Sequence, residues 1–333
     1  MLHLDNLNYA TPPTKLFQRG SVIATDFLLI YSVKTYCSKF VPNTDSKLFI
    51  GKKFIVFWSI VMNFGLLIID HIHFQYNGFL FGMFVMSVVK MLEGKHLSSA
   101  FWFAVLLNFK HIFLYIAPVY FVYLLRSYCF RRSGASVDAA SGQYEGMLVV
   151  FGADLRDFLP LNLIKLGVVV VSIFTVSLGP FVYLGQLGQV ASRLFPVKRG
   201  LCHAYWAANF WALYAGADKC ATIVLSKLGV LGSSVGTARM TGGLVRQQSF
   251  AVMWNVPPIV TGVLTLLAML PVLKKLWYKP FARTLFVPAL TLCAYASFLF
   301  GYHVHEKVLS FVKCPSLALL PSGRIWPIFY FFG

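Results

Sequence analysis

Long apolar runs separated by short polar turns dominate this chain, and the pattern predicts a bundle of membrane-spanning helices. A helix needs roughly 20 residues to cross the hydrocarbon, and the runs are continuous rather than alternating as in an outer-membrane barrel. We expect an all-α polytopic membrane protein with about 8–10 helical segments. The apolar runs, with boundaries good to about four residues, are 20–36, 54–69, 78–92, 99–109, 112–125, 161–184, 257–273, 284–301 and 308–320.

Two stretches depart from this pattern. A further run at 207–225 is broken by Asp218 and Lys219, so we expect an interfacial or re-entrant helix there. Residues 131–158 are rich in Gly, Ser and Ala, which is typical of a flexible connecting loop. The whole chain, 1–333, is therefore expected to be a single transmembrane domain with few structured insertions.

Composition agrees with a membrane protein. Of 333 residues, 58% are hydrophobic and only 12% are charged, which excludes an ordinary soluble domain. The net charge of +18 could suggest nucleic acid, but the basic residues lie mostly in short loops between apolar runs, so no nucleic-acid partner is expected. The six cysteines include no CxxC pair, which favours neither a zinc site nor a redox motif.

The basic loops predict the orientation of the chain, because short loops rich in Lys and Arg face the cytosol. Alternation then places five other segments together on the opposite side: 1–19, 70–78, 109–111, 185–206 and 302–307. An interfacial belt of aromatic and histidine residues is the alternative, although a belt should decorate both faces of the bilayer. The basic residues that define the cytosolic loops are Lys39, Lys47, Lys52, Lys53, Lys90, Lys95, Arg126, Arg131, Arg132, Lys274, Lys275 and Lys279.

Three polar clusters on the second side form a candidate substrate site, a cationic and aromatic basin at membrane depth. Arg and Lys can bind phosphate oxygens while aromatic faces stack on sugar rings, so the basin suits an anionic head on a lipid tail. The candidate binding residues are Asp70, His71, His73, Gln75 and Tyr76; Arg193, Lys198, Arg199 and His203; and His303, His305, Glu306 and Lys307.

Other roles for these residues are open. Lys198 and Arg199 could extend to lipid headgroups, and Asp70 could be a helix-end carboxylate paired with a histidine. His303 and His305 lack the spacing of a metal motif, so no metal is expected.

Four quoted stretches carry a resemblance: "DHIHFQYNGFLFG", "FAVLLNFKHIFLYIAPVYFVYLLRSYCF", "SRLFPVKRGLCHAYWAANFWALY" and "GYHVHEK". They resemble the endoplasmic reticulum alpha-1,3-glucosyltransferases of asparagine-linked glycosylation. The resemblance implies a GT-C type bundle in the endoplasmic reticulum membrane, surrounded by membrane lipids, with its active face lumenal. It also implies glucose transfer with inversion from dolichyl-phosphate glucose to a dolichyl-pyrophosphate-linked oligosaccharide, without a cofactor. Residues 202–206 resemble the enzymes that add the second glucose.

One departure from the family concerns the catalytic base. In the family the presumed base is an aspartate in the first lumenal loop, and residues 1–19 resemble only the tail of that loop. We therefore expect a chain that is truncated at both ends, to which no catalytic residue can be assigned and which does not transfer glucose by itself. Residues 185–256 are expected to form a lumenal loop with interfacial helices, and residues 131–158 a cytosolic loop. A transporter or lipid carrier, or a non-catalytic membrane protein, is the alternative.

Overall fold

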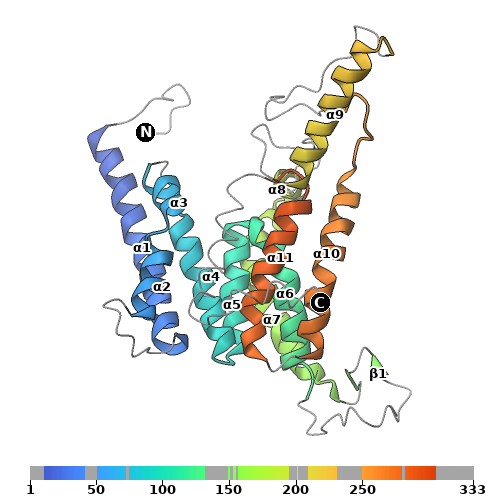
Figure 1. Cartoon of the computed structure of the whole chain (residues 1–333). Coiled ribbons are helices and arrows are strands. Elements are labelled where there is room, and N and C mark those ends of the chain that lie inside the picture. The colour runs from blue at the N-terminus through green and yellow to red at the C-terminus, as the bar shows by residue number, and fades with distance from the viewer. Residues whose placement is uncertain are drawn as a thin grey trace. The chain divides into compact units, whose positions relative to one another are not determined.

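The computed structural model describes residues 11–41, 51–72, 75–131, 149–150, 153–154, 157–194, 201, 209–230, 250–279 and 282–304. These residues are helical apart from connecting turns and two short strands, β1 (Val149–Val150) and β2 (Ala153–Asp154), which pair antiparallel (Figure 1). The chain divides into two compact units. Unit 1 contains the described residues up to Lys110, and unit 2 contains those from His111 onward.

Unit 1 consists of α1 (Pro12–Phe40), α2 (Lys52–Val61), α3 (Phe64–Leu66), the π-helical turn η1 (Leu67–Ile72), α4 (Asn77–Leu92) and α5 (His96–Phe109). Helix α1 begins eight residues before the apolar run at 20–36, with Pro12 in the first turn, where its missing N–H costs nothing. The run predicted at 54–69 is interrupted at Asn63, whose side chain accepts a hydrogen bond from the Gly65 N–H and starts a new helix.

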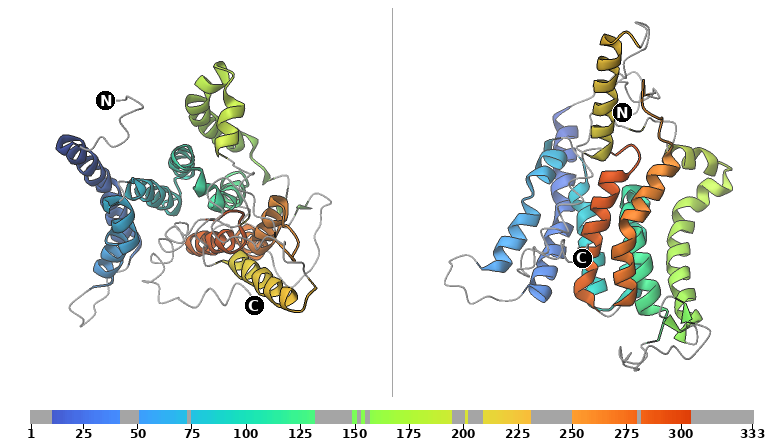
Figure 2. Two further views of the ribbon diagram at one scale, coloured as in Figure 1. Left: turned by 90° about the horizontal axis from the view of Figure 1, so that it is seen from above. Right: turned by 45° about the vertical axis from the view of Figure 1, so that its right-hand side comes forward.

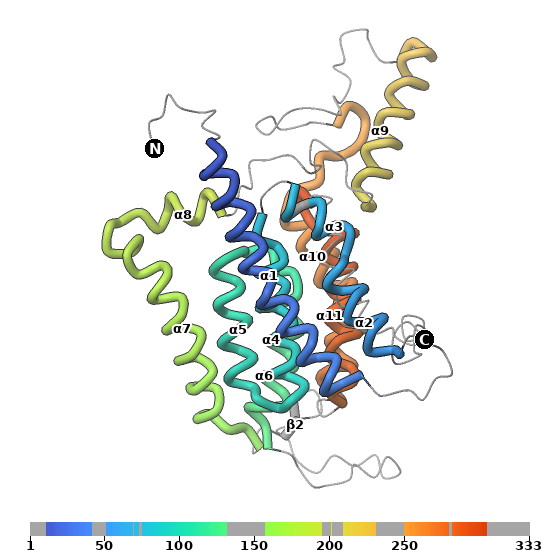
Figure 3. The backbone as a smooth tube through the Cα atoms, turned by 90° about the vertical axis from the view of Figure 1, so that its left-hand side faces the viewer, coloured from blue at the N-terminus to red at the C-terminus, as the bar shows by residue number. Residues whose placement is uncertain are grey.

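Helices α1 and α4 lie side by side and run in the same direction (Figure 3). A Cβ atom on Gly82 would lie 2.7 Å from the Leu29 nitrogen, so glycine is what allows the two backbones to approach. Gly78 and Gly82 form a small-xxx-small pair, the pattern that lets transmembrane helices pack closely. The two glycines of α4 therefore permit the close contact with α1.

An ion cluster joins the ends of α1 and α4. Glu93 follows α4 and pairs with Lys39 from the last turn of α1, with Lys95 at 3.2 Å and with Lys90 at 3.7 Å. The Lys39 hydrogen bond, aided by Lys95 and opposed by partial burial, lowers the pKa of Glu93 to about 2. Three lysines from predicted cytosolic segments thus gather at one end of unit 1.

Unit 2 consists of η2 (His111–Ile116), α6 (Ala117–Tyr128), the two strands, α7 (Pro160–Tyr183), α8 (Leu187–Leu194), α9 (Phe210–Lys227), α10 (Pro258–Tyr278), η4 (Arg283–Leu285) and α11 (Phe286–Phe300). Helices α6, α10 and α11 pack together (Figure 2). The Phe286 ring lies 5.2 Å from the ring of Tyr120 and 5.0 Å from that of Tyr123, and Phe286 is fully buried. This aromatic cluster forms part of the unit's core.

Three helices among the described residues are long and apolar enough to cross a membrane: Pro160–Tyr183, Pro258–Tyr278 and Arg283–Phe300. In α7 only 6% of the apolar window is buried within the protein, so nearly all of that surface is available to lipid. The shorter helices α4 and α5 are also apolar. The prediction of an all-α membrane protein is confirmed.

Helix α9 spans most of the run at 207–225, where the sequence predicted an interfacial or re-entrant helix, and it continues without interruption through Asp218 and Lys219. Asp218 is fully buried and accepts hydrogen bonds from the N–H groups of Ala251, Val252 and Met253 at 2.8–3.1 Å. Burial raises the pKa of this carboxyl, but the three backbone donors together lower it below its usual range. The carboxylate therefore anchors the segment that precedes α10.

Candidate functional site: the Asp26–His71 pocket

The turn between η1 and α4 is organised around Asp70, which is 1% exposed. Its carboxylate accepts hydrogen bonds from Asn77 Nδ2 at 2.7 Å and from the Gly78 N–H at 2.5 Å. Since the first N–H groups of a helix have no partner within the helix, Asp70 satisfies one of them from the preceding turn. Both of its oxygens accept a hydrogen bond, so Asp70 stabilises the start of α4.

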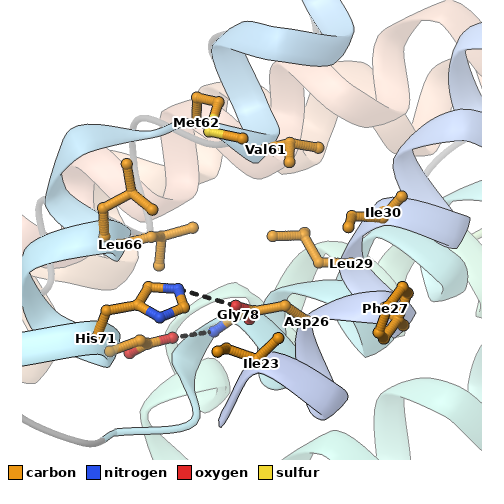
Figure 4. Close-up of a pocket in the computed structure, with 12 residues that line it drawn as sticks. Ile23, Asp26, Phe27, Leu29, Ile30, Val61, Met62, Leu66, His71 and Gly78 are labelled. Carbon is orange, nitrogen blue, oxygen red and sulfur yellow. Dashed lines mark hydrogen bonds and ion pairs between the residues drawn. The ribbon is translucent and has the colours of Figure 1, made fainter. Parts of the chain in front are cut away.

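His71, the next residue, pairs with a carboxylate of another helix. Its Nε2 lies 3.0 Å from Oδ2 of Asp26 in α1 (Figure 4). The sequence left open whether Asp70 pairs with a histidine; in the structure His71 pairs with Asp26 instead. Asp26 was missed by the sequence analysis, although a carboxylate inside the apolar run 20–36 was a signal for it.

Gly78 makes room for the Asp26 carboxylate. A Cβ atom at this position would collide with Oδ1 of Asp26, so any larger residue would displace the carboxylate or the helix. The carboxylate therefore lies against the first turn of α4, where the positive end of the helix dipole stabilises a negative charge. The position of the Asp26 carboxylate therefore requires glycine at residue 78.

Lys110, which follows α5, reaches the same turn. Its Nζ donates to Asn77 Oδ1 at 2.6 Å, and Asn77 Nδ2 also donates to Gln75 Oε1 at 3.1 Å. The Tyr76 hydroxyl lies 2.9 Å from Ser21 Oγ in α1. Alternation placed segments 70–78 and 109–111 on one side of the membrane, and within unit 1 Lys110 of the second segment contacts Asn77 of the first.

A cavity of about 300 Å³ opens beside the Asp26–His71 pair. Its polar wall is formed by Asp26, Asp70 and His71, and the rest is lined by apolar side chains of α1, α2, α3 and η1 together with Gly78 (Figure 4). The side chains of His71 and Asp26 are 36% and 22% exposed, so the imidazole is the more accessible of the two. Such a cavity can accept an amphiphile that hydrogen-bonds at one wall.

In unit 2 the structure describes two of the candidate residues. Arg193 is exposed in the last turn of α8. His303 follows α11 with a left-handed φ of 52°, and its N–H donates to the Leu201 carbonyl at 2.9 Å. Trp211 Nε1 donates to the Phe300 carbonyl at 3.0 Å, so Leu201 and Trp211 each contact the residues at the end of α11.

The remaining candidates lie outside the described residues: His73, Lys198, Arg199, His203, His305, Glu306 and Lys307. That the clusters of the two units form one basin stays a prediction. Within the described ranges, no group of three or more His, Cys, Asp or Glu side chains is placed to hold a metal ion.

Known proteins similar to this chain give the family. The ALG6, ALG8 glycosyltransferase family matches residues 1–332. Three relatives are named dolichyl pyrophosphate Glc1Man9GlcNAc2 alpha-1,3-glucosyltransferase. The one from Mus musculus is 47% identical over 327 residues, that from Bos taurus 46% over 326, and that from Schizosaccharomyces pombe 46% over 320.

The alignments cover 95–98% of this chain but 58–59% of each relative. The chain thus spans somewhat more than half the length of these relatives. The family match spans residues 1–332, a range that includes every residue that lines the Asp26–His71 pocket. The chain belongs to the ALG6, ALG8 glycosyltransferase family.

Proposed function

We propose that this protein takes part in the transfer of glucose, in alpha-1,3 linkage, from dolichyl-phosphate glucose to a monoglucosylated dolichyl-pyrophosphate-linked oligosaccharide. The reaction would take place on the lumenal side of the endoplasmic reticulum membrane. The observation that carries the proposal is the family match over residues 1–332, together with relatives 46–47% identical that bear the name of this activity. The membrane-spanning helices support it, because both lipid-linked substrates reside in a bilayer.

The proposed chemistry needs three kinds of group. A base must deprotonate the acceptor hydroxyl, cations must stabilise the departing phosphate, and a polar wall must orient the sugars. Asp70 is poorly suited to be the base, because it is buried and both its oxygens already accept hydrogen bonds. His71 and Tyr76 are partly exposed on the same turn, and we assign to them contacts with the substrate.

The test is a transfer assay with the native gene product, purified from its own membranes. It is supplied with dolichyl-phosphate glucose and a monoglucosylated lipid-linked acceptor, and the product is measured by mass spectrometry as a gain of one hexose. An acceptor without glucose is the specificity control. No hexose gain in folded protein would contradict the proposal, and a preference for the unglucosylated acceptor would assign the first glucose instead.

A further inference from the structure

We propose that Asp26 is a positioning residue for His71, that Gly78 is the residue which permits this arrangement, and that the imidazole so held contacts the substrate in the unit 1 cavity. This inference rests on the proposed function and adds residues to it. Asp26 lies on a predicted membrane span, whereas the candidate residues taken from the sequence lie on turns. Its proposed role is therefore argued from its contacts in the structure.

The first step is the position of α1. Helix α4 carries Gly78 and Gly82 one turn apart on one face, and α1 packs against that face with Asp26 and Leu29 at the two contact points. The backbone contact at Gly82 fixes the depth of α1 along α4. Asp26 is thereby held beside the N-terminus of α4, where η1 delivers His71.

The second step is the distribution of carboxylates. Two of them line the cavity, but Asp70 is occupied by Asn77 and by the Gly78 N–H. Lys110 donates a hydrogen bond to Asn77, which in turn donates to Asp70, so Lys110 is linked to Asp70 through Asn77. Asp26 is the carboxylate that pairs with His71. Because the Asp26 carboxylate accepts a hydrogen bond from His71 Nε2, that ring nitrogen carries a proton and the orientation of the imidazole ring is fixed.

The third step is access. The imidazole is more exposed than the carboxylate behind it, and the cavity beside it is otherwise lined mainly by apolar side chains. A lipid-linked sugar entering the cavity can therefore contact His71, while Asp26 acts through His71. This is the arrangement of a positioning carboxylate; in metal-binding histidine sites, removal of such a carboxylate costs about 10–100-fold in metal affinity or activity.

The alternative is that the pair only joins η1 to α1. The His71→Gln variant separates the two roles, because its amide N–H can reach a position close to that of Nε2 and so retain the bond to Asp26. A merely structural pair would leave H71Q close to wild type. A substrate-contacting imidazole predicts that H71Q loses about as much activity as H71A.

The experiment measures kcat/KM for glucose transfer with the full native protein and its variants, each checked for folding by thermal melting. We expect H71A, H71Q and D26A to lose about tenfold or more. D26N keeps an acceptor oxygen and should lose less than D26A. The double variant D26A/H71A should be no worse than H71A, because Asp26 acts only through His71.

Glycine variants supply the matched controls. G78A should reproduce the loss seen in D26A, because its Cβ displaces the carboxylate. G20A, in α1 with no atom within 4 Å of the added Cβ, should keep wild-type activity. G82A displaces the backbone contact that sets the depth of α1 along α4, so we expect it to lower both the melting temperature and the activity.

The outcomes separate this inference from the proposed function. A wild-type protein that transfers no glucose overturns both. Two results with an active wild type overturn this inference and leave the proposed function standing. One is a near-normal kcat/KM of H71Q, and the other is a kcat/KM of D26A/H71A in which the losses of the two single variants multiply.

Discussion

Replacement of Asp218 should release the segment that leads into α10. The carboxylate makes three hydrogen bonds to consecutive backbone N–H groups, those of Ala251, Val252 and Met253. Hydrogen bonds to a charged group contribute about 1.5–3 kcal/mol each, but contributions from one carboxylate are not additive. We therefore expect D218A to weaken the closed state of this segment by about 3 kcal/mol.

Amide hydrogen exchange measures this directly. If the segment opens locally, about 3 kcal/mol corresponds to roughly a hundredfold faster exchange of the three amides. D218N keeps one carboxamide oxygen, which can still accept from Val252 and Met253, so its effect should be smaller and greatest at Ala251. C220S, at an exposed neighbouring position in α9, is the control.

A D218A protein whose amides at 251–253 exchange at the wild-type rate would refute the reasoning. So would an acceleration of equal size throughout α9 and α10, because that pattern indicates global rather than local opening. The C220S control must show neither effect.

Three further predictions concern unit 1. The lowered pKa of Glu93 stabilises the folded state above its ordinary pKa of 4.5, and this contribution is lost as pH falls to about 2. The melting temperature of the wild type should therefore drop across that range. E93Q should be about 1 kcal/mol less stable at neutral pH, and its melting temperature should change less with pH. G82A should cost about 1–3 kcal/mol by overpacking against Leu29, whereas G20A should be neutral or slightly stabilising, as melting in detergent would show. D70N should cost about 1–2 kcal/mol through its bonds to Asn77 and Gly78, and unchanged melting would contradict the capping role.

Apolar patterning predicted some helix ends closely and others poorly, for identifiable reasons. Helix α7 occupies 160–183 against an expected 161–184, because its apolar run is long and begins at a proline. Helix α1 extends to Pro12 because the intervening Lys15, Gln18 and Arg19 favour helix without being apolar. Apolarity alone gives no signal for such polar helical turns.

The candidate site was predictable only as far as local sequence reaches. Counting spans predicted that segments 70–78 and 109–111 lie on one side of the membrane, and the Lys110–Asn77 hydrogen bond is consistent with that prediction. The pairing of His71 with Asp26 depends on how α1 packs against α4, which no local pattern encodes. The GxxxG spacing at Gly78 and Gly82 marked the contact face but not its partner.

The shared direction of α1 and α4 also sets a depth in the bilayer. Lys39 lies thirteen positions after Asp26, which corresponds to about 20 Å along a helix axis. We expect α1 to cross the membrane, as the apolar run 20–36 predicts. With α1 along the normal of a hydrocarbon layer about 30 Å thick and the Lys39–Glu93 cluster at one headgroup layer, the Asp26–His71 pair would lie about 10 Å beneath the other. A polar substrate group that meets His71 would then leave the headgroup layer and enter the membrane, where the scarcity of water strengthens every hydrogen bond it makes.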